Sequence, residues 1–291
     1  MGGDIERSQN AAVANTSNEN FGCCGGFRAD FRLNFFQRTD ADGKILDLER
    51  SFCASERTLW VLLPKLAFFT LTVADVISGL ATTKYPGFWM AYLSNWSLVY
   101  ATIYISLSFF VSLGLSSLLF IKMTWTMFSI AIVHEILVMF LFWFLEYDSD
   151  YDLDYYTIMT HGGVALCVVL DGLIVNRTPV RIKHWIPTFA MSLLYTIWNV
   201  IHSYVVEDNP WIDDDDQIYI YAALNWRDDP VQTAVTIVIV LLFVSPAFHL
   251  IIWKLSLCSR RYEEESAKNG LLVVPAGEKD VEETVPSAQV Y

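Results

Sequence analysis

Basic residues are scarce in this chain relative to acidic ones, and this scarcity excludes one class of partner. The 291 residues include 19 Lys and Arg against 32 Asp and Glu, which gives a formal net charge of −13. Proteins that bind nucleic acid neutralise its phosphates with a basic surface. We therefore expect no nucleic acid among the partners.

Cysteine is also rare, and the chain shows no secretory signal peptide. Its five cysteines are Cys23, Cys24, Cys53, Cys167 and Cys258. None of them falls in a segment that we expect outside the cell, which argues against a disulfide framework. The first 57 residues are polar and lack the apolar core of a signal peptide. They also lack the Ser or Thr that N-myristoylation needs at position six, whereas Cys23, Cys24 and Cys258 are either palmitoylated or free thiols.

Long apolar blocks are abundant. Hydrophobic residues make up 54% of the chain, more than in an ordinary soluble domain. A block of about 20 apolar residues is long enough to cross a bilayer as a helix. Such blocks lie at 58–80, 89–120, 123–145, 155–176, 182–206 and 230–253. They predict an all-α membrane protein with a bundle of six transmembrane helices at 58–256, between a partly disordered N-terminal tail (1–57) and a disordered C-terminal tail (257–291).

The Lys and Arg residues between the blocks predict the orientation, because basic residues concentrate in cytoplasmic loops. One side carries Lys122, Arg177, Arg181, Lys183, Lys254, Arg260 and Arg261, and the other carries only Lys84 and Arg227. Loops 146–154 and 207–229, on the poorer side, hold thirteen acidic residues. Both termini are therefore predicted to be cytoplasmic, the acidic loops face outward, and the lipid bilayer of the plasma membrane is the expected surrounding.

Polar side chains that are costly in hydrocarbon recur at one depth of the predicted bundle. A helix rises about 1.5 Å per residue, so the distance of a residue from the end of its block gives its depth. Asp75, Ser94, Asn95, His161 and His202 come from four different blocks and share the outer third of the bilayer. The spacing predicts a shared depth but not a shared face.

A hydroxyl beside a neutral imidazole has a chemical use. If His161 takes the proton of Ser94, the serine can attack an acyl carbon. Asp75 would orient the ring, and Asn95 would stabilise the oxyanion. The structural alternative is that the serine bonds the carbonyl one turn back and the histidine is a packing residue.

No metal or other cofactor is expected. The aspartates at alternate positions of 148–154 are similar to a calcium loop, but the loop's Gly at the sixth position and Glu at the twelfth are missing. A zinc site built from Asp75, His161 and His202 has no supporting ligand spacing. A solvated acidic face is the simpler interpretation of the loop.

Three further histidines receive structural interpretations. His134 and Glu135 lie in the middle of the third block, where we expect a hydrogen-bonded pair, with a proton relay as the alternative. His184 and His249 lie near the cytoplasmic ends of their blocks, and we expect both at the membrane interface.

Several motifs resemble those of a known family. They are FWMAYLSNW at 88–96, HGG at 161–163, RTPVR at 177–181, and IY with LNW at 220–226. In this order they resemble the rolling stone family, multi-span proteins named for an insect myoblast-fusion protein. The resemblance covers residues 58–256. It implies a role in cell–cell contact or myoblast-type membrane fusion, with a cell-surface partner at the acidic outer loops.

More distantly, the layout is similar to the androgen-induced transmembrane hydrolases, which cleave fatty acid esters of hydroxy fatty acids with an intramembrane threonine and histidine. By motif position these two residues fall on Ser94 and on His161, ten residues before Asp171. This resemblance implies an intramembrane lipid-ester hydrolase as the alternative function. The chain departs from that family by its serine at the nucleophile position and by Gly162–Gly163 after the histidine.

Overall fold

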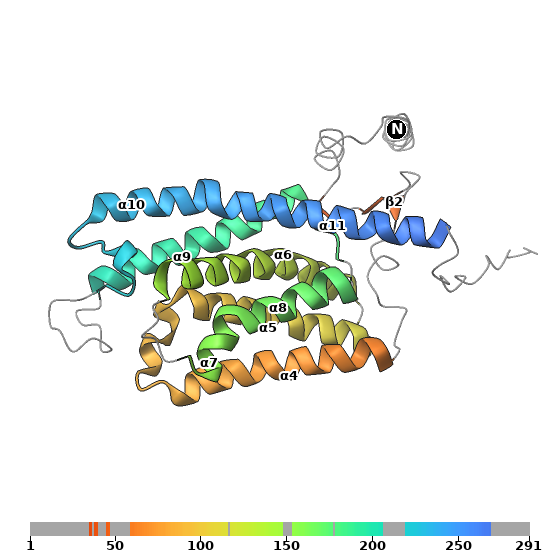
Figure 1. Cartoon of the computed structure of the whole chain (residues 1–291), viewed down its shortest axis with the longest axis horizontal. Helices are drawn as coiled ribbons and strands as arrows, with labels where there is room; N and C mark the ends of the chain where they lie inside the picture. Colours follow the sequence, from red (N-terminus) through yellow and green to blue (C-terminus); the bar gives the residue numbers. More distant parts are fainter. Residues whose placement is uncertain are drawn as a thin grey trace, which may run out of the picture.

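The computed structural model describes residues 35–36, 38–39, 45–46, 59–115, 117–147, 153–176, 178–205 and 219–268. Long helices lie side by side along the longest axis of the molecule (Figure 1). The only strands in these residues, β1 (Arg38–Thr39) and β2 (Ile45–Leu46), pair antiparallel. Most of the predicted tails at 1–57 and 257–291 lies outside the described residues, and so do Cys23, Cys24 and the side chain of Cys258.

Several of the helices contain π-helical segments, which are η2, η3, η4 and η7, whereas η1, η5 and η6 are short 3-10 helices. In chain order the elements are α4 (Leu59–Thr82), η1 (Pro86–Ala91), α5 (Leu93–Leu113), α6 (Leu118–Leu141), η2 (Phe142–Glu146), α7 (Tyr155–Ile158), η3 (Met159–Gly163), α8 (Val164–Val169), η4 (Leu170–Val175), η5 (Ile182–His184), α9 (Trp185–Val205), η6 (Ala222–Leu224), α10 (Pro230–Ile239), η7 (Val240–Val244) and α11 (Ser245–Lys268).

In the parts of the chain that the structure describes, five helices are long and apolar enough to cross a bilayer. They are Leu59–Thr82, Leu93–Leu113, Leu118–Glu146, Tyr155–Val175 and Pro230–Ser256. In the first and in the last of these helices, only 17% of the most apolar 18-residue stretch is buried inside the protein. Most of their apolar surface therefore faces outward. The sixth predicted span, α9, has 21 residues but is not among these candidates. The helical bundle is confirmed, with five of its six predicted spans as candidate membrane helices.

The boundary between the second and third predicted spans, expected at 121–123, is wrong. Helix α5 already ends at Leu113, because Gly114 adopts a left-handed conformation with φ 112° and caps it. Ser117 then begins α6, and its side chain accepts a hydrogen bond from the Phe120 backbone N–H. Lys122 therefore lies inside α6 and not in a loop.

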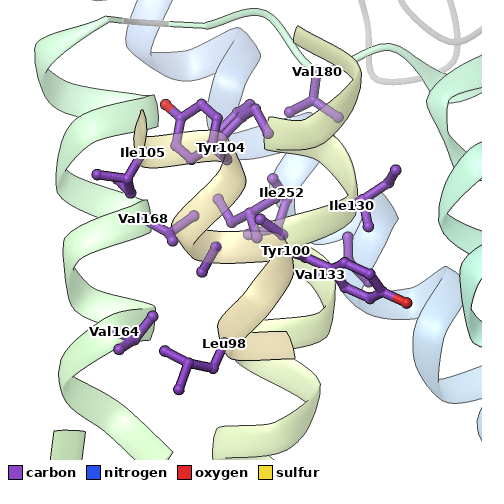
Figure 2. Close-up of a cluster of buried hydrophobic side chains, with 14 of the residues drawn as sticks. Leu98, Tyr100, Tyr104, Ile105, Ile130, Val133, Val164, Val168, Val180 and Ile252 are labelled. Carbon is purple, nitrogen blue, oxygen red and sulfur yellow. The ribbon is translucent and has the colours of Figure 1, made fainter. Parts of the chain in front are cut away.

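The apolar core is built around α5 and α6, with side chains of α8 and α11 closing it (Figure 2). Leu98 and Ile105 of α5 meet Val164 and Val168 of α8, and all four are buried. This packing fixes α5 and α8 against each other. It thereby holds the elements that carry Ser94 and His161 next to one another.

Gly172 in η4 is required by the packing of Phe128 on α6. A Cβ atom at Gly172 would overlap the Phe128 ring, which is fully buried. Because overpacking a core costs about 1–3 kcal/mol, we expect Gly172→Ala to lower the Tm in detergent. Gly87→Ala is the control, since nothing lies within 4 Å of a Cβ at Gly87. Equal Tm values for the two variants would contradict this account of the contact.

Candidate functional site

Two cavities meet near the end of the bundle at which α7 begins and α9 ends. The first has a volume of about 180 Å³ and is lined mainly by apolar side chains of α6, η2, α9, α10 and η7. The second, of about 510 Å³, is lined by more polar side chains of α4, α5, α7 and η3. The residues that line both are Ser94, Phe142, Glu146, His161 and Tyr221. These five, which we call the shared wall, lie between a strongly apolar cavity and a more polar one, which we call the apolar and the polar cavity.

Ser94 lies in the first turn of α5, directly after the 3-10 helix η1. Its side chain is almost buried, with 8% exposure, and faces both cavities. The Leu93 backbone N–H donates to the Tyr221 hydroxyl at 3.2 Å, which fixes the Tyr221 ring over the start of α5. Ser94 thus lies at the start of α5 and belongs to the shared wall.

His161 lies in the π-helical turn η3, a kind of segment that is frequent at functional sites. Its Nδ1 is 2.9 Å from the Thr157 carbonyl oxygen. Because a carbonyl only accepts, Nδ1 carries a proton, and in the neutral ring Nε2 is then the nitrogen with the free electron pair. The ring stacks on Phe142 with centroids 3.7 Å apart and an interplanar angle of 14°. These two contacts orient the imidazole, and in its neutral form Nε2 is the nitrogen that can act as a general base.

Asn95 and Asp75 are held by hydrogen bonds around the second cavity. Asn95 donates from Nδ2 to the Trp89 carbonyl at 2.6 Å and accepts from the Tyr156 hydroxyl at 2.9 Å. Asp75 is fully buried, and its Oδ2 accepts from the Thr160 hydroxyl at 3.0 Å. The carboxylate therefore contacts the residue before His161, whereas the predicted contact was with the His161 ring itself.

The structure brings three of the five predicted site residues to one cavity. Ser94, Asn95 and His161 all line the second cavity, although no hydrogen bond within the described chain joins Ser94 to His161. Asp75 lies behind Thr160. His202 packs edge-on against Phe88, with centroids 4.6 Å apart, and is not among the described residues that line either cavity.

No family model, curated protein or solved structure gives a significant match to this chain. Its class is decided by five apolar helices of bilayer length packed in one helical bundle. The chain is a multi-pass membrane protein. Contact with a lipid bilayer follows from these helices.

Lys65 is a buried charge of this membrane protein that the sequence pattern did not indicate. Its Nζ lies 3.1 Å from Asp171 Oδ1, and both side chains are 1% exposed. Lys65 also donates to Asn176 Oδ1 at 2.7 Å, while Tyr104 and Ser108 each donate to Asp171 Oδ2 at 2.7 Å. This cluster joins α4, α5 and η4. The sequence feature that indicates this cluster is a lysine within an apolar block, because a charge in the membrane needs a partner at its own depth.

His134 and Glu135 of the membrane protein do not form the expected pair with each other. His134 Nε2 lies 3.0 Å from the Ser192 hydroxyl, and Glu135 Oε1 accepts from Ser97 at 2.7 Å. Each residue therefore connects α6 to a different helix, α9 or α5. His134 and Ser192 also line the first cavity, which makes them a second hydroxyl–imidazole pair to be tested beside Ser94 and His161.

His184 and His249 are buried inside the protein, and their expected position at the depth of the membrane interface stays a prediction. The two ring nitrogens of His184 lie 2.8 Å from the Ser129 hydroxyl and 3.0 Å from the Phe35 carbonyl. His249 Nε2 lies 3.0 Å from the Arg181 carbonyl. Each buried ring therefore has polar partners inside the protein.

Most of the acidic residues predicted to face outward lie outside the described residues, including the aspartates at 148–152 and 213–216. Asp154, the last member of the suspected calcium loop, is the N-cap of α7. Within the described ranges no group of three His, Cys, Asp or Glu side chains is arranged to hold a metal ion.

Removing the Asp154 cap should weaken the helix that carries His161. Its Oδ1 accepts from the Thr157 backbone N–H at 2.7 Å, and this hydrogen bond lowers the pKa of the carboxyl. A lowered folded-state pKa means that the stabilisation is present above the unfolded pKa and is lost as the pH falls through the folded one. We expect Asp154→Ala to cost about 1 kcal/mol at neutral pH and Asp154→Asn, which still caps, much less.

Thermal unfolding of the Asp154 variants in detergent at neutral and acid pH measures both effects. Wild type should lose more stability on acidification than Asp154→Asn does. Identical Tm values for the Ala and Asn variants at neutral pH would show that the cap contributes nothing.

Proposed function

We propose that this membrane protein is an intramembrane lipid-ester hydrolase with Ser94 as nucleophile and His161 as general base. The observation that carries the proposal is the shared wall, where both residues lie between an apolar and a polar cavity. A lipid ester has one apolar and one polar part, so its ester group fits at this wall while the two parts occupy the two cavities. The positional resemblance to the threonine and histidine of the androgen-induced hydrolases supports the same assignment.

The proposed reaction uses His161 in its neutral form, with the proton on Nδ1 and the free electron pair on Nε2. Nε2 takes the proton of Ser94 as Oγ bonds to the ester carbonyl carbon. The bond from that carbon to the alcohol oxygen then breaks, and the alcohol leaves with the proton from Nε2. A water molecule hydrolyses the acyl-serine in the second half, with Nε2 again as base, and releases a fatty acid. The first half needs Ser94 and His161 to approach each other, which substrate binding would bring about.

Neighbouring residues have positioning roles in this proposal. The amide of Asn95 uses one N–H on the Trp89 carbonyl, which leaves its other N–H for a developing oxyanion. Asp75 acts through Thr160 on the position of η3, and His202 has no part in the reaction.

The rolling stone resemblance implies a different function, in cell–cell contact or membrane fusion at the plasma membrane with both termini cytoplasmic. Its proposed surface is the acidic outer loops. Two acids of these loops that the structure describes serve local structure, since Asp228 accepts from Asn225 and Asp229 caps α10. The contact role stays a prediction, and it is compatible with hydrolysis.

A fluorophosphonate probe tests the hydrolase proposal, because it modifies a serine only when a base activates it. We expect the purified protein to be labelled, Ser94→Ala to be unlabelled and His161→Ala to be labelled far more slowly. Ser192→Ala is the matched control, since Ser192 pairs with His134 in the first cavity. Labelling that persists in Ser94→Ala, or a folded wild type without labelling, would overturn the proposal.

A further inference from the structure

The described walls of the two cavities carry no Lys or Arg side chain. Among the described residues that line either cavity none is Lys or Arg, and the only acid is Glu146, on the shared wall. The polar lining of the second cavity consists mainly of hydroxyl groups, from Thr82, Thr83, Tyr92, Ser94, Tyr156, Thr157, Thr160 and Tyr221. A group placed there meets mainly hydroxyls, together with the Asn95 amide, the His161 ring and one carboxylate.

We infer that the substrate is a neutral, single-chain lipid ester whose head group carries hydroxyls, the chemical class of the monoacylglycerols. This inference rests on the proposed hydrolase function and names its substrate. It differs from what the distant resemblance implies, because an ester of a hydroxy fatty acid brings a carboxylate into the polar cavity.

Electrostatics disfavours an anionic head group at this place. Glu146 lies on the shared wall, next to the position of the ester group, and no basic side chain of the lining offsets it. Asp75, fully buried behind Thr160, keeps an Oδ1 without a hydrogen-bond partner among the described residues. An anion in the lined space would therefore be repelled by the Glu146 carboxylate between low-dielectric walls.

Zwitterionic head groups meet the same obstacle. Their ammonium suits Glu146, but their phosphate must enter the same cavity without a base to bind it. A glycerol head group brings only hydroxyls, which donate to Glu146 and both donate to and accept from the tyrosine and threonine hydroxyls. The lining therefore favours the neutral polyol over both charged classes.

The first cavity sets the number of chains. An apolar cavity of about 150 Å³ holds one benzene-sized group. The first cavity, at about 180 Å³, accordingly admits a segment of one acyl chain and not two chains side by side. Leu137, Leu141 and Leu241 line it, so that the chain contacts α6 and η7.

The experiment compares esters that share one acyl chain and differ in the head group. Purified wild type is given monooleoylglycerol, oleoyl lysophosphatidylcholine, oleoyl lysophosphatidate and the oleoyl ester of a hydroxy fatty acid, and kcat/KM is measured. We expect the glycerol ester to be preferred by at least about tenfold over each charged one. Equal or better turnover of a charged ester would overturn the inference and leave the hydrolase in place. Turnover of none of the four would overturn the hydrolase itself.

Glu146 variants test the physical cause. Glu146→Lys should raise the kcat/KM ratio of the carboxylate-bearing ester to monooleoylglycerol by at least about tenfold, because the wall then attracts the anion. Glu146→Gln, which removes the charge but keeps the shape, should raise that ratio less and serves as the second variant if the lysine impairs folding. Ratios that stay at the wild-type value in the folded variants would show that Glu146 does not select the head group.

Discussion

Lys65→Met should destabilise the membrane protein by about 3–5 kcal/mol, the cost of leaving a buried charge without its partner. Lys65 and Asp171 are each 1% exposed, with Nζ and Oδ1 3.1 Å apart. The methionine keeps most of the side-chain volume, so the loss is electrostatic rather than a packing defect. Unfolding of the purified protein in detergent, followed by circular dichroism, measures the change.

The double variant Lys65→Met with Asp171→Asn is the control for this expectation. It removes both charges, while the amide oxygen can still accept from Tyr104 and Ser108. Because deleting both members of a buried pair costs far less than deleting one, we expect the double variant to be more stable than Lys65→Met alone. If the double variant loses as much unfolding free energy as Lys65→Met and Asp171→Asn lose together when measured singly, the two charges are not coupled.

Ser94→Ala should lower kcat/KM for monooleoylglycerol by at least about 10³-fold, because the attacking oxygen is gone. His161→Ala should lower it by about 10²–10⁴-fold through loss of the base. Ser94→Thr keeps a hydroxyl at the position where the related hydrolases carry threonine, so measurable activity should remain. Ser192→Ala should stay within a few-fold of wild type. The release of oleate measures all four rates.

Stability measurements separate catalysis from structure in this series. Ser94 lies in the first turn of α5, and we expect Ser94→Ala and Ser94→Thr to unfold at similar temperatures. Equal activity of these two variants would assign Ser94 a structural role. A large loss in Ser192→Ala would instead move the chemistry to the pair with His134.

The helices were predictable because the apolar blocks are long and most of them are bounded by polar segments, and five of the blocks are candidate membrane helices. The residue at which α5 ends was not predictable from the sequence. Apolar residues continue past Gly114 into α6, so hydropathy shows no boundary there. The turn depends on the left-handed backbone of one glycine, a conformation that composition does not reveal.

The candidate site was predictable in depth but not in direction. Ser94, Asn95 and His161 were placed at one level by counting residues, and they line one cavity. His202 lies on α9, and its ring packs against Phe88 and Trp198. Which face of a helix turns inward depends on its neighbours, and residue counting along separate helices contains no such information. Lys65 was missed because the block around it is apolar on average.

Mapping the modified residue is the most direct test of the central claim, that Ser94 is an activated nucleophile at the wall between an apolar and a polar cavity. The wild-type protein would be treated with the fluorophosphonate probe, digested and sequenced by tandem mass spectrometry. The account predicts the phosphonyl adduct on Ser94, with competition by monooleoylglycerol. An adduct on Ser192 or another residue, with Ser94 unmodified, would contradict it.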